Sequence, residues 1–147
     1  MTNKFVCYCG LYCENCAVKV NVEPAAKVLY AEMKSAGFED VISFIPGGEG
    51  FWSFLKNMAD DGICISCQDG GGDPGCAIRI CAKEKNMEVC AQCDDYPCDK
   101  IAAFLEGHPT LDSDNKLLCD KGWTAWAALQ DERRKTGYTY QNERKDR

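Results

Sequence analysis

The amino-acid sequence predicts a mainly α-helical fold, a small cysteine-rich single domain with little or no β-sheet. Its 147 residues match one ordinary domain and suffice to bury a modest core. Apolar residues recur at helical intervals in several segments, whereas the alternating β-branched runs that indicate strands are scarce. Twelve cysteines bracket the first apolar helical stretch, so we expect cysteine-bearing loops to pin the helices.

The first half of the chain contains two predicted helices. Pro24 suits the first turn of a helix because its missing N–H is not needed there, and apolar side chains follow until Gly37 provides the stop. Residues 39–44 are expected to form a short helix. Residues 51–58 form a second amphipathic pattern, and we expect their aromatic side chains to belong to the core.

The second half is expected to begin irregularly, because Gly, Asp and Pro dominate residues 68–75. Helix-forming residues then predict a helix over residues 76–86. Pro97 marks the start of another helix that ends at Gly107, and a last helix runs from about residue 123 to residue 135. His108 falls in the turn between them and is expected at the surface. The predicted domain spans residues 1–137, followed by a mixed-charge tail over residues 138–147.

Charge and hydropathy argue against several classes of protein. The formal net charge is −6, and the basic residues near the C-terminus are interleaved with acidic ones, so a nucleic-acid partner is not expected. No run approaches the roughly 20 apolar residues of a membrane helix, so no membrane partner is expected either. Residues 1–10 lack the apolar stretch of a secretory signal. We therefore expect a cytoplasmic protein, whose thiols stay reduced.

The cysteines are spaced like metal ligands. Three Cys-x-x-Cys pairs occur, at residues 13 and 16, 64 and 67, and 90 and 93. Two intervening residues let a tight turn direct both sulfurs at one ion, and thiolates favour zinc and similar metals. Cys7 and Cys119 are interpreted as small buried hydrophobic residues. The candidate ligands are then Cys9, Cys13, Cys16, Cys64, Cys67, Cys76, Cys81, Cys90, Cys93 and Cys98.

Because a structural zinc ion takes four ligands, these ten cysteines suffice for two ions, but more than one grouping stays open. In one, the pairs 64/67 and 90/93 share an ion in a ribbon-like arrangement, and the pair 13/16 joins two of the other four. In the other, the sequential set of residues 64, 67, 76 and 81 binds one ion. Sequence spacing does not choose between them.

Short motifs around these cysteines resemble a known family. They are Cys-Gly-Leu-Tyr-Cys-x-x-Cys from Cys9, a mid-chain Cys-x-x-Cys from Cys64, Cys-Ala-Ile-Arg-Ile-Cys-Ala from Cys76, Cys-Ala-Gln-Cys from Cys90, and Tyr-Pro-Cys ending at Cys98. Together they are similar to a small cysteine-rich domain-of-unknown-function family of bacteria and archaea, over a stretch from about Cys9 to Leu105. The resemblance implies a zinc-binding role for the ten candidate ligands, carries no activity, and leaves Cys7 and Cys119 outside its pattern.

The expected function is zinc binding in structural sites, within an interaction or scaffold module that has an unidentified protein or small-molecule partner. A closed four-thiolate site has no open position for a substrate, so no catalytic residue is assigned. An iron–sulfur redox protein with a [4Fe–4S] cluster is the main alternative, because thiolates bind both metals. A thiol–disulfide oxidoreductase also stays open. A radical S-adenosylmethionine-type enzyme stays open as well. Cys9-x-x-x-Cys13-x-x-Cys16 has the cysteine spacing of such enzymes, and Gly47-Gly48-Glu49 resembles one of their motifs, although the sequence lacks the strands that they need.

Overall fold

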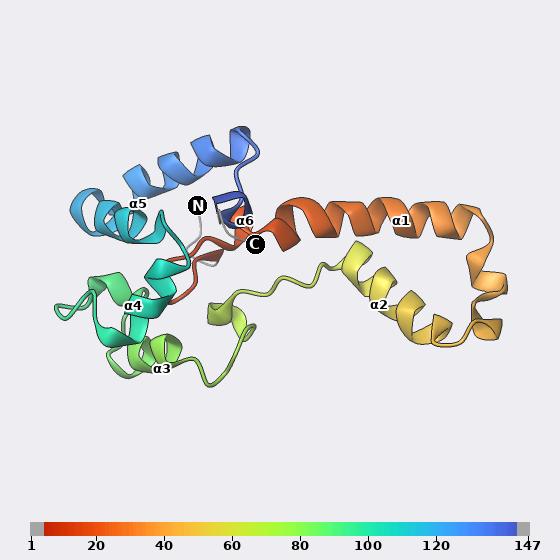
Figure 1. Ribbon diagram of the computed structural model, residues 1–147, viewed down its shortest axis with the longest axis horizontal. Helices are drawn as coiled ribbons and strands as arrows, with labels where there is room; N and C mark the ends of the chain where they lie inside the picture. Colours follow the sequence, from red (N-terminus) through yellow and green to blue (C-terminus); the bar gives the residue numbers. More distant parts are fainter. Residues whose placement is uncertain (1–4, 144–147) are drawn as a thin grey trace. The chain divides into compact units, whose positions relative to one another are not determined.

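The structure is a computed structural model that describes residues 5–143. Every regular element in this part of the chain is a helix or a single helical turn, and its one β-type contact is an isolated bridge between Val6 and Tyr12 (Figure 1). The predicted mainly α-helical fold is therefore confirmed. Within the same residues, no helix is both long and apolar enough to cross a bilayer. The chain divides into two compact units: unit 1 comprises Met1–Cys16 and Ile65–Arg147, and unit 2 comprises Ala17–Cys64.

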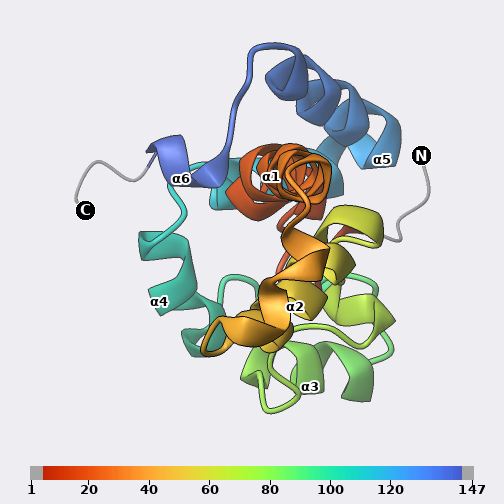
Figure 2. The same cartoon turned by 90° about the vertical axis from the view of Figure 1, so that its right-hand side faces the viewer.

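Unit 2 is a helical hairpin in which helices α1 and α2 lie side by side (Figures 1 and 2). Helix α1 spans Glu23–Ser35 and follows a π-helical turn, while α2 spans Gly48–Asp60. As predicted, a proline lies in the first turn of α1, and the helix ends just before Gly37. The short helix expected at residues 39–44 is instead two 3-10 turns, which meet at Val41 with a φ of −119°.

Helix α2 buries only one side. Leu55 is buried, and Trp52 packs against Tyr30 of α1 with ring centroids 4.8 Å apart. Phe51 and Phe54, however, are 46% and 54% exposed, so the expectation that they belong to the core is wrong. A two-helix hairpin buries a single stripe of each helix, and these two positions fall beside that stripe.

A buried carboxylate joins the two ends of unit 2. Glu23 Oε1 accepts the backbone N–H groups of Ile63 at 2.8 Å and Cys64 at 3.0 Å, and Oε2 lies 3.0 Å from Lys19 Nζ. Burial alone raises the pKa of Glu23, but the N–H groups and the ammonium outweigh it and leave the pKa below its ordinary value. Gly62 has a φ of +74°, and a Cβ there would meet Glu23 Oε1 at 2.6 Å, so the contact requires glycine.

Unit 1 contains the remaining helices, which are α3 (Ala77–Glu84), α4 (Asp99–Glu106), α5 (Leu111–Lys135) and α6 (Tyr140–Glu143). The first two lie within their predicted bounds. Of the irregular loop predicted at residues 68–75, residues 70–75 are irregular, whereas residues 68 and 69 belong to a 3-10 turn, Cys67–Asp69. Helix α5 is longer than predicted because a second helical segment precedes Gly122, whose φ of 76° and ψ of 178° break it. That first segment is rich in Asp, Ser and Asn, which favour caps and turns and so gave no helical signal.

The core of unit 1 forms where α5 meets the N-terminal segment. Trp126 is fully buried in a cluster with Val6, Tyr12, Val89 and Leu118. A second apolar cluster is built on Cys9, Ile78 and Ile101. The N-terminal cysteine loop is therefore part of the core and not an appendage.

A buried polar network reinforces the same junction. Asp114 forms a bidentate ion pair with Arg133 and accepts Gln130 Nε2 at 3.1 Å. Gln130 Oε1 in turn accepts Asn15 Nδ2 at 2.7 Å. Asp114, Gln130 and the partly buried Arg133 therefore pair with one another, whereas Asn15 Oδ1 has no hydrogen-bond partner within the described residues.

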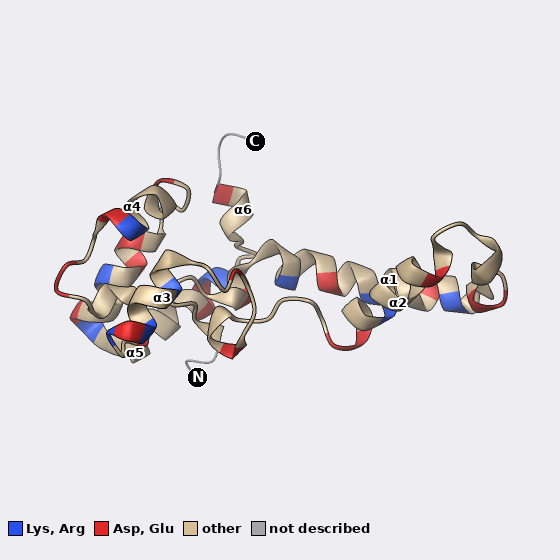
Figure 3. Ribbon diagram, turned by 90° about the horizontal axis from the view of Figure 1, so that it is seen from below, with Lys and Arg blue, Asp and Glu red and all other residues tan. Residues whose placement is uncertain are grey.

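The segment after α5 packs on unit 1 as far as the structure describes it. Tyr140 is 5% exposed, and its hydroxyl accepts the N–H of Tyr12 at 2.9 Å, although the sequence places it in the mixed-charge tail. Residues 144–147 lie outside the described part. Acidic and basic residues lie close together at the end of α5 (Figure 3). Arg134 Nη1 is 3.8 Å from Asp131 Oδ1, and Lys135 Nζ is 3.2 Å from Glu132 Oε2.

Candidate metal centre

The N-terminal cysteines lie on a tight loop that α5 holds in place. Gly10 N–H donates to the Cys7 carbonyl, and Cys7 N–H donates to the Leu11 carbonyl, each at 2.8 Å. Asn115 of α5 donates its Nδ2 to the Cys9 carbonyl at 3.0 Å, and a Cβ on Gly10 would lie 1.9 Å from Asn115 Oδ1. Glycine with a φ of +96° is therefore what allows the loop to rest against the helix.

Three thiols of this loop and one from a later segment form a group that we call the Cys7 cluster: Cys7, Cys9, Cys13 and Cys67. The Cys7 and Cys13 sulfurs are 3.5 Å apart, and the thiols of Cys67 and Cys9 also influence the pKa of Cys7. Tyr8 N–H donates to Cys67 Sγ at 3.3 Å. All four residues belong to unit 1, with Cys67 brought from the segment that follows unit 2.

The Cys7 cluster favours one thiolate. Contacts from the thiols of Cys13, Cys67 and Cys9 hold the pKa of Cys7 far below its ordinary value. The same contacts with Cys7, together with burial, raise the pKa of Cys9 and of Cys67. One negative charge is thus shared among several sulfurs, and each further deprotonation is opposed by the first. A cation placed among these sulfurs would remove that opposition.

A second group of four, the Cys90 cluster, is defined by charge, since the thiols of Cys81, Cys93 and Cys98 all act on the pKa of Cys90. Burial raises the pKa of Cys90 to about 12, with repulsion from Cys98, Cys81 and Cys93 adding to the rise. Cys90 begins a 3-10 turn, Cys98 directly precedes α4, and Cys81 lies in α3. Lys85 Nζ lies 2.9 Å from Cys93 Sγ, so this sulfur already has a cationic neighbour.

The other four cysteines lie outside both clusters. Cys16 Sγ is 3.9 Å from Gln141 Nε2, Cys76 directly precedes α3, and Cys64 belongs to unit 2. Cys119 is exposed and donates to the Ala91 carbonyl at 3.1 Å, so its interpretation as a buried hydrophobic residue is wrong.

The two groupings that the spacing favours stay predictions. The influence of Cys67 on the pKa of Cys7, and of Cys81, Cys93 and Cys98 on the pKa of Cys90, favours a further grouping in which Cys67 and Cys90 belong to different clusters. Cys7, which the sequence set aside, has the Cys13 sulfur 3.5 Å away. No local sequence signal indicates this contact, because Cys7 and Cys9 lie on a tight turn closed by the hydrogen bond from Gly10 N–H to the Cys7 carbonyl.

The donor chemistry of both clusters suits zinc, which binds thiolates in fours. All twelve cysteines are free thiols in the structure. In residues 5–143, however, no three Cys, His, Asp or Glu side chains already stand in a geometry that holds an ion. Metal binding would therefore require the thiols to lose protons and to adjust around a common centre.

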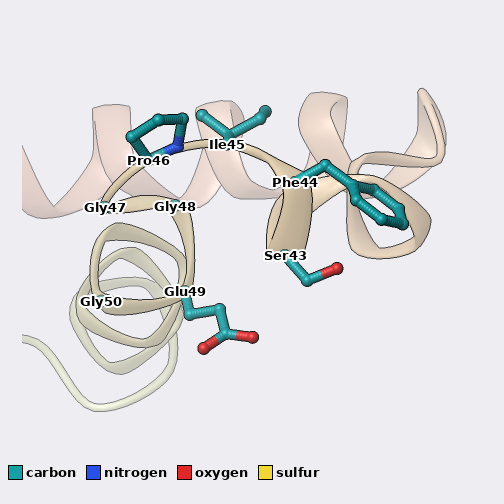
Figure 4. A pocket seen from close by; sticks show the side chains of 8 residues that line it. All are labelled: Ser43, Phe44, Ile45, Pro46, Gly47, Gly48, Glu49 and Gly50. Carbon is teal, nitrogen blue, oxygen red and sulfur yellow. The ribbon is translucent and has the colours of Figure 1, made fainter.

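Two other sequence features lie apart from the clusters. His108 is 9% exposed, stacks on Phe104 and places Nδ1 2.9 Å from the Phe104 carbonyl, so it is not the surface residue expected. Gly47-Gly48-Glu49 begins α2 in unit 2, beside a surface hollow where Ser43 and Glu49 project from one side of the chain and Pro46 from the other (Figure 4). The described residues contain no strand on which a radical-enzyme barrel would be built.

Comparison with known proteins gives one match. A family model described as a protein of unknown function, DUF3795, matches residues 5–103. This stretch contains both clusters, including Cys7, and excludes Cys119 and the whole of α5. No curated protein and no solved structure matches the chain.

Proposed function

We propose that this chain, which belongs to the DUF3795 family of proteins of unknown function, is a zinc-binding protein with two structural ions. The family model covers residues 5–103 of its 147 residues. The Cys7 cluster would hold one ion and the Cys90 cluster the other. Each cluster supplies four sulfurs, which is the full ligand set of a structural zinc site.

The observation that carries this proposal is the convergence on the Cys7 sulfur. Cys7 and Cys13 lie 3.5 Å apart, and Cys67 arrives from more than fifty residues further along the chain. Four thiols meeting in one core offer poor hydrogen bonds to each other, since sulfur is a weak donor and acceptor. A dication would replace their protons and offset the charge that they accumulate.

A structural role follows from the number of ligands. Four thiolates fill the tetrahedral positions of zinc and leave none for a substrate or a water molecule. Zinc would contribute folding free energy by joining the N-terminal loop to the segment at Cys67, and α3 to the start of α4. A reducing compartment such as the cytoplasm would keep the thiols available for this role.

The test measures metal content and ligand identity together. Protein purified without oxygen is expected to contain two zinc ions per chain by elemental analysis. Cys7→Ser and Cys90→Ser are each expected to lower the content to one, while Cys16→Ser and Cys119→Ser leave it at two. Retention of two ions by Cys7→Ser would contradict the assignment of that cluster.

The same preparation separates the alternatives. A brown protein with stoichiometric iron and sulfide would replace zinc by an iron–sulfur cluster. A metal-free protein whose cysteines exchange readily with a dithiol would indicate a thiol–disulfide oxidoreductase. Chelation is expected to melt the helical signal of unit 1, and an unchanged circular dichroism spectrum after complete zinc removal would refute the structural role.

A further inference from the structure

Unit 2 carries an apolar surface that is separate from both thiol clusters. Between α1 and α2 lies a hollow of about 500 Å³, which we call the hairpin groove. Its lining residues are Asn21, Val22, Ala25, Ala26, Leu29, Phe51, Phe54, Leu55 and Met58. Asn21 is the only polar residue among them. The groove lies wholly within unit 2 and does not depend on the proposed zinc sites.

The lining residues repeat at the spacing of two helical turns. Val22, which ends the π-helical turn before α1, and Leu29 of α1 are seven residues apart, and Phe51 and Met58 are seven apart on α2, which corresponds to about 10 Å of helix axis. Val22 is 42% exposed, Leu29 46%, Phe51 46% and Phe54 54%. The groove therefore presents paired apolar ridges of the length that one short helix covers.

Two acidic positions lie beside the groove, whereas Lys19, one turn before the lining residue Val22, is paired with Glu23 at 3.0 Å. Glu32 lies one turn beyond Leu29 on α1, and Asp61 lies one turn beyond Met58 at the end of α2. Lys27 and Lys56 each fall two residues from a lining position and so face other directions. Unit 2 contains four lysines against seven carboxylates, a formal charge of −3 (Figure 3). A partner with basic flanks is electrostatically favoured.

The exposed area argues against a second copy as the occupant. A phenylalanine buries about 150–250 Å² in full, so Phe51 and Phe54, about half exposed, leave about 200 Å² open. With Val22 and Leu29, the groove offers roughly 350 Å², against about 800 Å² per partner in a stable interface. Two copies would also bring their acidic edges together. One amphipathic helix avoids both problems, because it needs only a single apolar stripe.

We propose that the hairpin groove binds an amphipathic helix of a partner protein. The apolar side chains of that helix, at helical positions i, i+3 or i+4, and i+7, fill the groove between Leu29 and Phe54. Its lysines or arginines flank the apolar stripe and face Glu32 and Asp61. The complex is then a three-helix arrangement in which the half-exposed rings are covered.

The test titrates the full chain with synthetic peptides made of Leu and Lys. In one peptide the Leu residues form a single helical face, and in a second of equal composition they are scattered. We expect only the first peptide to bind saturably. Binding is monitored by the shifts of the backbone amide NMR signals of residues 17–64. Phe54→Ser is expected to weaken binding about tenfold or more, since it removes a central apolar contact. Phe44→Ser is the matched control, because Phe44 is 83% exposed but does not line the groove.

Charge and alternative occupants are tested with the same variants. The double variant Glu32→Lys and Asp61→Lys is expected to weaken the Leu–Lys peptide and to favour a Leu–Glu peptide. Equal binding of the scattered peptide, or no saturable binding, would overturn the proposal. Self-association that Phe54→Ser abolishes would assign the groove to a second copy, and Phe54-dependent binding to anionic lipid vesicles would assign it to a membrane surface. Unchanged helical circular dichroism in Phe54→Ser establishes that the variant is folded.

Discussion

Removing Glu23 should destabilise unit 2, because its carboxylate joins the two ends of the unit. In Glu23→Ala the N–H groups of Ile63, which is 39% exposed, and of the partly buried Cys64 lose a charged acceptor, and each such hydrogen bond contributes about 1.5–3 kcal/mol. The desolvation that the carboxylate no longer suffers offsets part of this, so we expect a net loss of about 3 kcal/mol. Glu23→Gln keeps an acceptor oxygen and loses the charge beside Lys19, for an expected loss of about 1 kcal/mol.

The assay has to report on unit 2 by itself. Hydrogen exchange in increasing urea, read by mass spectrometry on peptides from residues 17–64, gives the opening free energy of this unit. Glu32→Ala is the matched control, since Glu32 is an exposed glutamate of the same helix, and its change is expected to stay within about 0.5 kcal/mol.

A second variant approaches the same contact from the opposite side. Gly62→Ala would bring a Cβ to 2.6 Å from Glu23 Oε1 and would strain a φ of +74°, so it should destabilise unit 2 without removing any hydrogen-bonding group. The reasoning is refuted if Glu23→Ala opens no more easily than Glu32→Ala. It is also refuted if Gly62→Ala has the stability of the unchanged protein.

Three further outcomes are expected in unit 1. Gly10→Ala should lower the melting temperature and the zinc content together, because its Cβ would lie 1.9 Å from Asn115 Oδ1; a variant with full zinc content and stability would contradict the close approach. Asp114→Ala should cost about 2–3 kcal/mol in urea unfolding, because the partly buried Arg133 loses its ion-pair partner and Gln130 Nε2 loses its acceptor, whereas Asp131→Ala, at an exposed ion pair, should cost under about 1 kcal/mol. Cys119→Ser should leave melting temperature and bound metal unchanged, since the residue is exposed and outside both clusters.

Where the sequence carried a periodic signal, the helices were predicted well. The helix from Glu23 to Ser35 combines proline at its start, glycine after its end and apolar residues between them, all of which act within a few residues. The first half of α5 was missed because Asp114 and Asn115 are buried polar residues. Their helical state is stabilised by Arg133, Gln130 and the N-terminal loop, which no local pattern reveals.

The aromatic residues of α2 were predicted to be more buried than they are. Hydrophobicity predicts that Trp52, Phe51 and Phe54 are buried, but it does not indicate which neighbouring element would cover each ring. Trp52 packs on Tyr30, whereas Phe51 and Phe54 stay half exposed in the hairpin groove. The number of helices packed against α2 decided which rings were covered.

The sequence by itself determined the helical class and the thiol chemistry, because helix periodicity and Cys-x-x-Cys spacing are properties of neighbouring residues. Only the tertiary structure brings Cys7 beside Cys13 and places Cys67 in the same unit. The N-terminal loop is held by α5 through Asn115 and Gly10, and the chain returns to unit 1 just before Cys67, after the whole of unit 2. Spacing constrains sulfurs within one turn, but contacts across sixty residues depend on how the intervening segments pack.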